Sequence, residues 1–459
     1  MGRFMEVAMV VIATLAAMGS TAAATSNSHP PCSVRPTTFE GWKAQEISNE
    51  WTRLTIVPEL GGRLMQVTFS GHDFLFVNPK YKGKYISPTE AAGRWINYGG
   101  DKIWPMPEGS DDERHWALKS DLLDDGSYEL KVLSEGAKCS VRLEGPPDPV
   151  TGLQYTREIS LGNDSPQISF LATMKNITAH PIEWAMQSVS QYDVSDHRAP
   201  GTFNPGFWAF TPTNPNSAYF EGYQVRDGLA NDPSFAVKDG LFRLHWLYLQ
   251  NEVWLDSTAG WLALVDDTSR HAMVERFQPQ ARCNYPGKAS VIFYKNGATL
   301  ELDEGLKPRL SSSTQDETPF YMEAEINSPM VRLQPGEKFE MGTAWFPTRM
   351  DRELQSVADA GVVAAPLATT RIAKGLVITG RFGVFFSGTL QAHLYDRRGV
   401  EIGKLPVQAV RPEQMVVLQS EIAAPAETAR ISLHLVDQSG ADRGSLGEAP
   451  VALPRGGQK

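Results

Sequence analysis

Short runs in which apolar and polar residues alternate fill most of the chain and limit what it can fold into. Over residues 42–348 such runs recur every ten to fifteen residues, for example LFRLHWLYL at 241–249 and KASVIFYKNG at 288–297. Alternation with a period of two is typical of strands, and the Gly, Pro, Asn and Asp residues between the runs are typical of turns. This stretch has no long helical period and no fixed-length repeat. The pattern predicts one large antiparallel β-sandwich over 42–348.

The last ninety or so residues repeat the alternation after a break. In the segment 349–371, Leu354 and Val357 recur at helical spacing before a Gly and a Pro, which predicts a helical linker. Beyond it, KGLVITGRFGVFFSGTLQAHLYDRRGVEIGKLPV and ARISLHLVDQSG alternate again, with Asp-Arg-Arg-Gly as a hairpin turn. We therefore expect a small β-sandwich over 372–453, a tail over 454–459 and an all-β protein overall.

The N-terminus carries the features of an export signal. Arg3 is followed by an apolar run over 7–18 and then by small residues that end near Ala24. A charged start, a short apolar run and small residues predict a secretory signal peptide over 1–24, and the run is too short to span a bilayer. The residues 25–41 then form an N-terminal extension. The protein is expected to be secreted or periplasmic.

Charge and composition exclude some partners. The formal net charge is -10, without long runs of one sign, whereas nucleic acid and anionic lipid favour clustered Lys and Arg. We therefore expect no nucleic-acid partner and no membrane span. Eleven Trp and 13 Tyr suit partners with flat apolar faces, sugars among them, as well as ordinary core packing.

Cysteine spacing and known metal motifs give little support for a metal or a cofactor. The chain has no HExxH pair, no phosphate loop and no Gly-x-Ser-x-Gly elbow, and SDDE at 110–113 lacks the glycine-punctuated spacing of a calcium loop. We predict neither a cofactor nor a metal site. Cys32, Cys139 and Cys283 cannot all pair; a Cys139–Cys283 bridge is one option in an oxidising compartment, but spacing alone does not establish it.

The segment FYMEAEINSPMVRLQPGEKFEMGTAWF at 320–346 is the most informative strand pattern. Alternation places Glu323, Glu325 and Asn327 on one face and apolar residues on the other. The two carboxylates then lie about 6 to 7 Å apart, and like charges at that spacing raise at least one pKa, which suits a general acid or base. The alternative is a solvated strand face.

This hairpin, with its Asn-Pro loop and Leu-x-Pro-Gly-Glu turn, resembles the C-terminal hairpin of the galactose mutarotase-like (aldose 1-epimerase) superfamily. LTIVPELGGRLMQVTFSGHDFLFV at 54–77 resembles the opening hairpin of that superfamily, and NYGGDKIWP at 97–105 falls where its members carry a His-Gly-Gly segment. The GG-x-x-x-WP-x-PE form is closer to an uncharacterised secreted bacterial branch, a domain of unknown function. The resemblance covers residues 42–348.

The resemblance implies a large antiparallel β-supersandwich that binds a sugar in a groove across one sheet. In the epimerases a Glu acts as base on the anomeric hydroxyl and a His protonates the ring oxygen, and the matching Glu is Glu323. The two histidine positions are occupied here by Tyr98 and Gln187, while His180 lies seven positions too early. Tyr, with a pKa of about 10, and Gln cannot replace His in this role. These departures argue against ordinary mutarotation and leave sugar recognition in place.

The predicted function is that of an exported carbohydrate-binding, and conceivably carbohydrate-active, protein whose partner is a mono- or oligosaccharide. The alternative is a structural or adhesive envelope protein without catalytic activity. Trp104 and Trp116 would offer flat faces, or else be buried structural residues; Arg94 would hold hydroxyls by a forked contact, or else form a surface ion pair. With Glu323 as the catalytic candidate, the predicted sugar-contacting residues are Arg94, Tyr98, Lys102, Trp104, Glu108, Trp116, Gln187 and Glu325.

Overall fold

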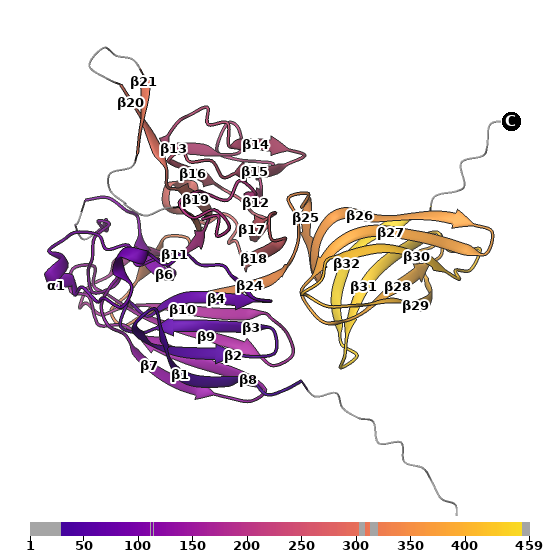
Figure 1. Ribbon diagram of the computed structural model, residues 1–459, viewed down its shortest axis with the longest axis horizontal. Coiled ribbons are helices and arrows are strands. Elements are labelled where there is room, and N and C mark those ends of the chain that lie inside the picture. Colours follow the sequence, from indigo (N-terminus) through magenta and orange to yellow (C-terminus); the bar gives the residue numbers. More distant parts are fainter. Residues whose placement is uncertain (1–28, 111, 113, 303–307, 313–319, 452–459) are drawn as a thin grey trace, which may run out of the picture.

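The computed structural model describes the chain except for residues 1–28, 111, 113, 303–307, 313–319 and 452–459. The predicted signal peptide and the predicted tail lie outside the described residues. In the described part almost all regular structure is β-strand, arranged as a large sandwich followed by a smaller one (Figure 1). The all-β prediction is confirmed.

Two antiparallel sheets build the large sandwich. The 12-stranded sheet has the order β1 (Ser33–Phe39), β2 (Trp42–Ser48), β3 (Thr52–Val57), β4 (Arg63–Phe69), β6 (Asp101–Met106), β11 (Ile182–Asp193), β22 (Tyr321–Asn327), β19 (Val291–Lys295), β16 (Asn251–Leu255) and β13 (Gln224–Gly228), with β5 (His72–Asp73) on β4 and β23 (Val331–Leu333) on β11. The 10-stranded sheet has the order β14 (Phe235–Lys238), β15 (Leu241–His245), β12 (Phe207–Pro212), β17 (Trp261–Asp266), β18 (His271–Phe277), β24 (Lys338–Arg349), β10 (Ile168–Asn176), β9 (Leu153–Gly162), β8 (Lys138–Glu144) and β7 (Glu129–Ser134).

The core of the large sandwich lies between these sheets and follows the alternation of the sequence. On β22, Met322, Ala324 and Ile326 are buried in the apolar cluster, together with Trp184 of the adjacent β11 and Trp345 of β24 in the other sheet. Full burial of such side chains contributes about 1.5–3 kcal/mol each, so this face fixes the register of β22. The intervening residues of β22, Glu323 and Glu325, must then project from the opposite face.

A disulfide bond joins the two sheets near their edge. It links Cys32, immediately before β1, to Cys139 on β8, with a Cα–Cα distance of 5.9 Å. Cys283 is free and exposed, so the option of a Cys139–Cys283 bridge is corrected. The sandwich also starts earlier than expected, because β1 belongs to the predicted N-terminal extension.

The predicted helical linker over 349–371 is not formed. The chain there makes a turn and the strands β25 (Ser356–Ala358) and β26 (Gly361–Ile372), with Val362 and Val363 buried. The spacing of Leu354 and Val357 fits a helix, but the Val and Thr residues that follow favour a pleated strand. The small sandwich therefore begins with β25. Its sheets are β25-β26-β27 (Gly375–Val384)-β30 (Val416–Ile422) and β29 (Glu401–Val410)-β28 (Gly388–Tyr395)-β31 (Arg430–Asp437)-β32 (Asp442–Pro450).

The two sandwiches share an apolar cluster. Phe346 of β24 packs on Phe385 with ring centroids 4.6 Å apart, and Val274 of β18 belongs to the same cluster. The guanidinium of Arg276 lies 5.1 Å from the centroids of both phenylalanine rings and donates to the Ala358 carbonyl. The small sandwich is therefore packed against the 10-stranded sheet (Figure 1).

The remaining elements are short. They are the helices η1 (Pro79–Tyr81), α1 (Pro88–Ala91) and η2 (Pro286–Lys288) and the hairpin β20 (Ala298–Leu302) and β21 (Pro308–Ser312). Ser87 and Glu90 form a capping box at the start of α1. Among the helices that the structure describes, none has the length and apolar character needed to cross a bilayer.

Candidate functional site

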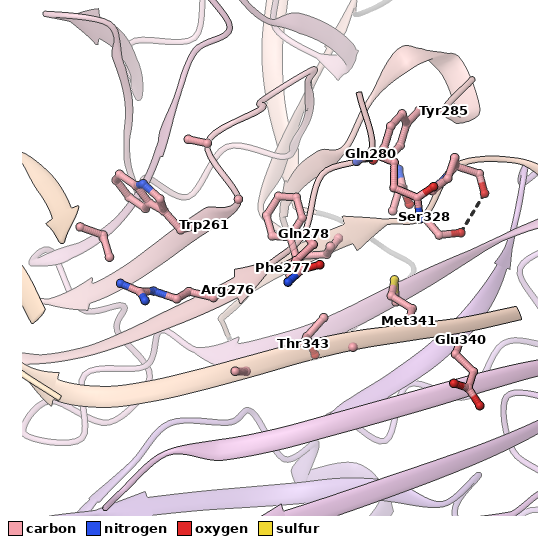
Figure 2. A pocket seen from close by; sticks show the side chains of 18 of the residues that line it. Trp261, Arg276, Phe277, Gln278, Gln280, Tyr285, Ser328, Glu340, Met341 and Thr343 are labelled. Atoms are coloured by element: carbon pink, nitrogen blue, oxygen red, sulfur yellow. Dashed lines mark hydrogen bonds between the residues drawn. The ribbon is translucent and has the colours of Figure 1, made fainter. Parts of the chain in front are cut away.

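A cavity of about 710 Å³ lies where the large and small sandwiches meet. Figure 2 shows Trp261 and Arg276 at one end and Gln280 and Tyr285 at the other. Of the row of polar residues on β22, only Asn327 lines this cavity; the glutamates of that strand do not. We place the candidate site at those glutamates instead, because buried polar groups without partners gather there.

The outward face of the 12-stranded sheet brings distant parts of the chain together. By strand register, Gln191 on β11 lies opposite Glu323 on β22, and Gln187 lies opposite Trp104 on β6. Glu323 and Glu325 are each only 6% exposed. We call this surface the acidic face; its members are Lys102, Gln187, Gln191, Glu252, Glu323, Glu325 and Asn327, with Glu108 just beyond the end of β6.

Two glutamines hold the paired carboxylates. Gln187 Nε2 donates to Glu325 Oε2 over 2.6 Å, and Gln191 Nε2 donates to Glu323 Oε1. In both glutamines the amide oxygen is buried without a hydrogen-bond partner. Buried polar atoms nearly always have a hydrogen-bond partner, so these two amide oxygens are candidate acceptors for a hydrogen bond from a ligand.

Burial and mutual repulsion change the protonation of the carboxyl groups. The pKa of Glu325 is raised well above its ordinary value, first by burial and then by the negative charges of Glu323, Glu252 and Glu108. Glu108 has an exposed surface but is surrounded by protein on most sides; loss of water around it, and then Glu252 and Glu323, raise its pKa to about 7. Burial and repulsion therefore favour the protonated forms of these carboxyl groups, which can donate as well as accept hydrogen bonds.

Lys102 is the cation of this face. It is 2% exposed, and its Nζ lies 3.9 Å from the ring centroid of Trp104 and 5.2 Å from that of Trp95, with no hydrogen-bond partner among the described residues. Burial and the charge of Arg63 lower its pKa to about 8, although Asp124 and Glu323 oppose this. A Lys with such a pKa can exchange a proton near neutral pH.

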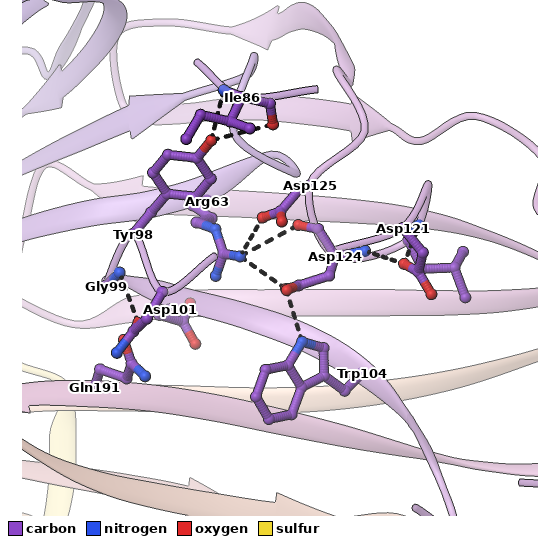
Figure 3. A network of polar contacts seen from close by, with 12 residues as sticks. Arg63, Ile86, Tyr98, Gly99, Asp101, Trp104, Asp121, Asp124, Asp125 and Gln191 are labelled. Carbon is purple, nitrogen blue, oxygen red and sulfur yellow. Dashed lines mark hydrogen bonds and ion pairs between the residues drawn. The ribbon is translucent and has the colours of Figure 1, made fainter. Parts of the chain in front are cut away.

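Behind Lys102, a polar network fixes β6 in place (Figure 3). Arg63 Nη2 donates to Asp124 Oδ1 over 2.7 Å and to Asp125 Oδ1 over 2.8 Å, and Trp104 Nε1 donates to Asp124 Oδ1 over 2.7 Å. The strand is reached through Gly99, whose φ is +92°; a Cβ there would lie 2.1 Å from the Phe76 carbonyl oxygen, so only glycine fits.

The two predicted stacking residues are buried instead. Trp104 is 3% exposed, and its ring is covered by Lys102 and by Trp116, whose ring centroid lies 5.2 Å away. Trp116 has no exposed surface and donates through Nε1 to Asp121 Oδ2 over 2.5 Å. Neither indole presents a face to a ligand; both support the strand that carries Lys102.

Tyr98 and Arg94 are engaged by their own loop. The hydroxyl of Tyr98, which is fully buried, accepts from Ile86 N over 2.8 Å and donates to Ile86 O over 3.3 Å. Arg94 is exposed and its Nε donates to Ala91 O over 3.1 Å at the end of α1. Among the predicted sugar-contacting residues, the structure thus brings Lys102, Glu108, Gln187 and Glu325 together with Glu323, and gives Arg94, Tyr98, Trp104 and Trp116 other contacts.

The sequence analysis did not identify two residues of this face on β16, nor Gln191 on β11. Glu252 and Trp254 share the acidic face, and Trp254 Nε1 donates to Glu252 Oε1. The indole of Trp254 is half-buried, with the Arg226 guanidinium 4.5 Å from its ring. The alternating pattern NEVWL at 251–255 carried this signal, since it puts a carboxylate and an indole on one side of a strand.

Comparisons with known proteins bear on the fold. No protein-family model and no functionally curated protein matches the chain. Similar solved structures include the Slr1438 protein from Synechocystis sp. PCC 6803 (11% identity over 68% of this chain and 99% of that one, TM-score 0.45). They also include galactose mutarotase-like proteins from Clostridium acetobutylicum (10% identity, 70% and 99% covered, TM-score 0.44) and Lactobacillus casei (12% identity, 66% and 99% covered, TM-score 0.40).

The similarity to galactose mutarotase-like proteins agrees with the resemblance seen in the sequence motifs. At TM-scores below 0.5 it carries no argument about chemistry. The function must therefore be inferred from the residues of the acidic face.

Proposed function

We propose that the protein binds a mono- or oligosaccharide on the acidic face. The observation that carries this proposal is a set of buried polar atoms without hydrogen-bond partners on one surface: Lys102 Nζ, Gln187 Oε1, Gln191 Oε1 and Asn327 Oδ1. Leaving such an atom unpaired costs about 1–3 kcal/mol. A ligand that supplies both donors and acceptors would recover this free energy.

Sugar hydroxyls fit that requirement better than a charged ligand does. Each hydroxyl can donate to an amide oxygen and accept from an ammonium or a protonated carboxyl group. Burial and the neighbouring carboxylates raise the pKa of Glu325 and so favour its protonated form, which can act as a donor. The half-buried indole of Trp254 adds an apolar surface at the rim, which suits the CH groups of a pyranose ring.

The alternative, a structural or adhesive protein, would be favoured by Glu323 and Trp104 lying on opposite faces. Their strands are separated by β11 alone, and both residues project to the same side of the sheet. This arrangement favours the binding proposal over the alternative.

The experiment is a glycan array followed by calorimetric titration of untagged protein. We expect at least one saccharide to bind, and Glu323→Gln to weaken it about tenfold or more, because it removes a buried acceptor. Glu183→Gln changes an exposed glutamate on β11 and serves as the matched control, with unchanged affinity. Failure of every mono- and oligosaccharide, uronates included, to bind the wild-type protein would overturn the proposal.

A reaction on the bound sugar is a separate proposal. Glu323 would act as the base and the carboxyl group of Glu325, whose pKa is raised by burial and by the neighbouring carboxylates, as the acid. Polarimetry on candidate aldoses measures the turnover. Equal rates in the wild-type and Glu323→Gln proteins would remove the enzymatic proposal while leaving the binding proposal intact.

We also propose that the protein is exported. The Cys32–Cys139 disulfide supports this, because such bonds persist in oxidising compartments. Mass spectrometry of the mature protein, expressed from the full-length gene, should find cleavage near Ala24 and an intact disulfide. Recovery of the uncleaved, reduced protein from the cytoplasm would contradict the proposal.

A further inference from the structure

Two histidines lie side by side on the small sandwich, away from the acidic face. His393 on β28 and His434 on β31 belong to adjacent strands of the β29-β28-β31-β32 sheet. Their neighbours Leu394 and Leu433 are buried in the apolar cluster, so alternation turns both histidines to the outward face. The two imidazole rings stack, with centroids 4.1 Å apart and planes 7° from parallel.

Carboxylates surround this pair. Asp442 Oδ2 lies 2.8 Å from His434 Nδ1, and Glu401 Oε2 lies 3.4 Å from His393 Nδ1. One ligand atom from each of His393, His434 and Asp442 lies within 4.8 Å of the others. A tetrahedral Zn²⁺ ion, with bonds of about 2.0–2.2 Å, holds its ligands about 3.4 Å apart, so a modest contraction would complete such a site.

The burial and hydrogen bonding of His393 are a second, independent observation that supports a ligand at this site. This residue is 4% exposed, and its Nε2 atom is buried without a hydrogen-bond partner. Neutral imidazole is the form that ligates metals, and a buried ring nitrogen without a partner is rarely left in a folded protein.

The local charge also suits a cation. Glu401 and Asp442 contribute two negative charges, and the nearby Lys404 ammonium lies 3.6 Å from Glu401. The two carboxylates outweigh the single ammonium, so the side chains around the imidazoles carry a net negative charge. Two imidazole nitrogens and a carboxylate oxygen are ligands that borderline divalent metals accept.

We propose that His393, His434 and Asp442 bind one divalent cation of the Zn²⁺ class, with Glu401 orienting His393. Because the lone pairs of two stacked rings lie in parallel planes, one imidazole must turn about its terminal side-chain torsion for both rings to face one ion. His434 is only half-buried and has the freedom to do so. The ion would join β28, β31 and β32 and so stabilise the small sandwich.

The test is calorimetric titration of Zn²⁺ into untagged, full-length protein that has been treated with EDTA. We expect one site with a Kd below about 100 µM and a rise in the thermal midpoint when Zn²⁺ is added. His434→Asn and Asp442→Asn should each weaken binding at least about tenfold. Circular dichroism of each variant shows whether it keeps its fold.

Two controls separate this site from adventitious binding. His180→Asn removes an exposed histidine of the large sandwich and Cys283→Ser removes the free thiol; both should leave the affinity unchanged. Absence of binding to the wild-type protein, or equal Zn²⁺ affinity in the folded His434→Asn and wild-type proteins, would overturn the proposal and leave the two rings as a packing contact. Neither result depends on whether a saccharide binds.

Discussion

The outward faces of the two large sheets have similar alternating sequences, but their charged residues differ in how far they are exposed to solvent. On the 10-stranded sheet, Arg142 and Glu158 lie opposite each other on β8 and β9 and form an ion pair of 2.5 Å that is largely exposed. On the 12-stranded sheet, Glu323 and Glu325 are buried beside each other, and the amide oxygens of the neighbouring Gln187 and Gln191 lack hydrogen-bond partners. Charged residues that alternate along a strand are thus a solvated surface in one case and a candidate binding site in the other. Burial distinguishes the two.

A third group of residues shows the condition under which buried carboxylates have a purely structural role. Asp124 and Asp125 are as buried as the glutamates of the acidic face, but Arg63 lies between them. The arginine compensates their charge, and the group anchors Trp104 behind the site. Buried carboxylates held by a neighbouring arginine therefore support the fold, whereas Glu323 and Glu325 are held by glutamine amides.

The largest expected effect comes from breaking that compensation. Arg63→Met should lower the free energy of unfolding by about 3–5 kcal/mol, because it leaves two buried carboxylates without their cation. Urea unfolding followed by tryptophan fluorescence measures the loss. A change below about 1 kcal/mol would mean that the aspartates are not held as buried charges.

The next effect concerns the pH dependence of stability. The folded protein holds the Glu325 proton more tightly than the unfolded chain does. This contribution is therefore complete below the unfolded pKa of about 4.3 and is lost as the pH rises through the raised folded pKa.

Glu325→Gln removes this titration, so the stability of the variant relative to the wild type should rise with pH above about 4.5, by up to about 1.4 kcal/mol per pH unit. Parallel urea titrations between pH 4 and 8 measure the difference. A constant difference across this range would show that the carboxyl group of Glu325 titrates normally.

A smaller effect is expected at Lys102. Lys102→Met keeps much of the volume packed on Trp104 but removes the ammonium group, so it should weaken saccharide binding by about 1–3 kcal/mol without lowering the thermal midpoint. Calorimetry and thermal melts of the same sample measure both quantities. Lower stability together with unchanged affinity would make Lys102 a structural residue.

The smallest effect is expected on the solvated face. Glu158→Gln breaks an exposed ion pair and should change stability by about 0.2–1 kcal/mol, less at high salt, with no effect on saccharide binding. A loss of affinity in this variant would show that the two outward faces do not differ as proposed.

The fold could be predicted because alternation is local. The pattern MEAEIN on β22 specifies which residues enter the core, and the structure places Met322, Ala324 and Ile326 there. The prediction of a helical linker was wrong because the spacing of Leu354 and Val357 is compatible with a helix as well as with a strand. Pairing of β26 with β27 favours the strand.

The site could be predicted only in part. Whether an indole is exposed or covered depends on side chains from other parts of the chain. Trp104 is covered by Lys102 and Trp116 and held by Asp124, and no local sequence pattern indicates these contacts. Conversely, Gln191 becomes relevant only through its register with Glu323, more than a hundred residues away. Strand pairing between distant segments is the information that a single sequence does not carry.

The most direct test of the central claim is a crystal structure of the protein soaked with the saccharide that binds most tightly in the array. The account predicts electron density for the sugar over β11 and β22, with its hydroxyls within hydrogen-bond distance of Glu323 and Glu325. Density for the sugar in the cavity between the sandwiches, lined by Trp261 and Tyr285, with the acidic face empty, would contradict it.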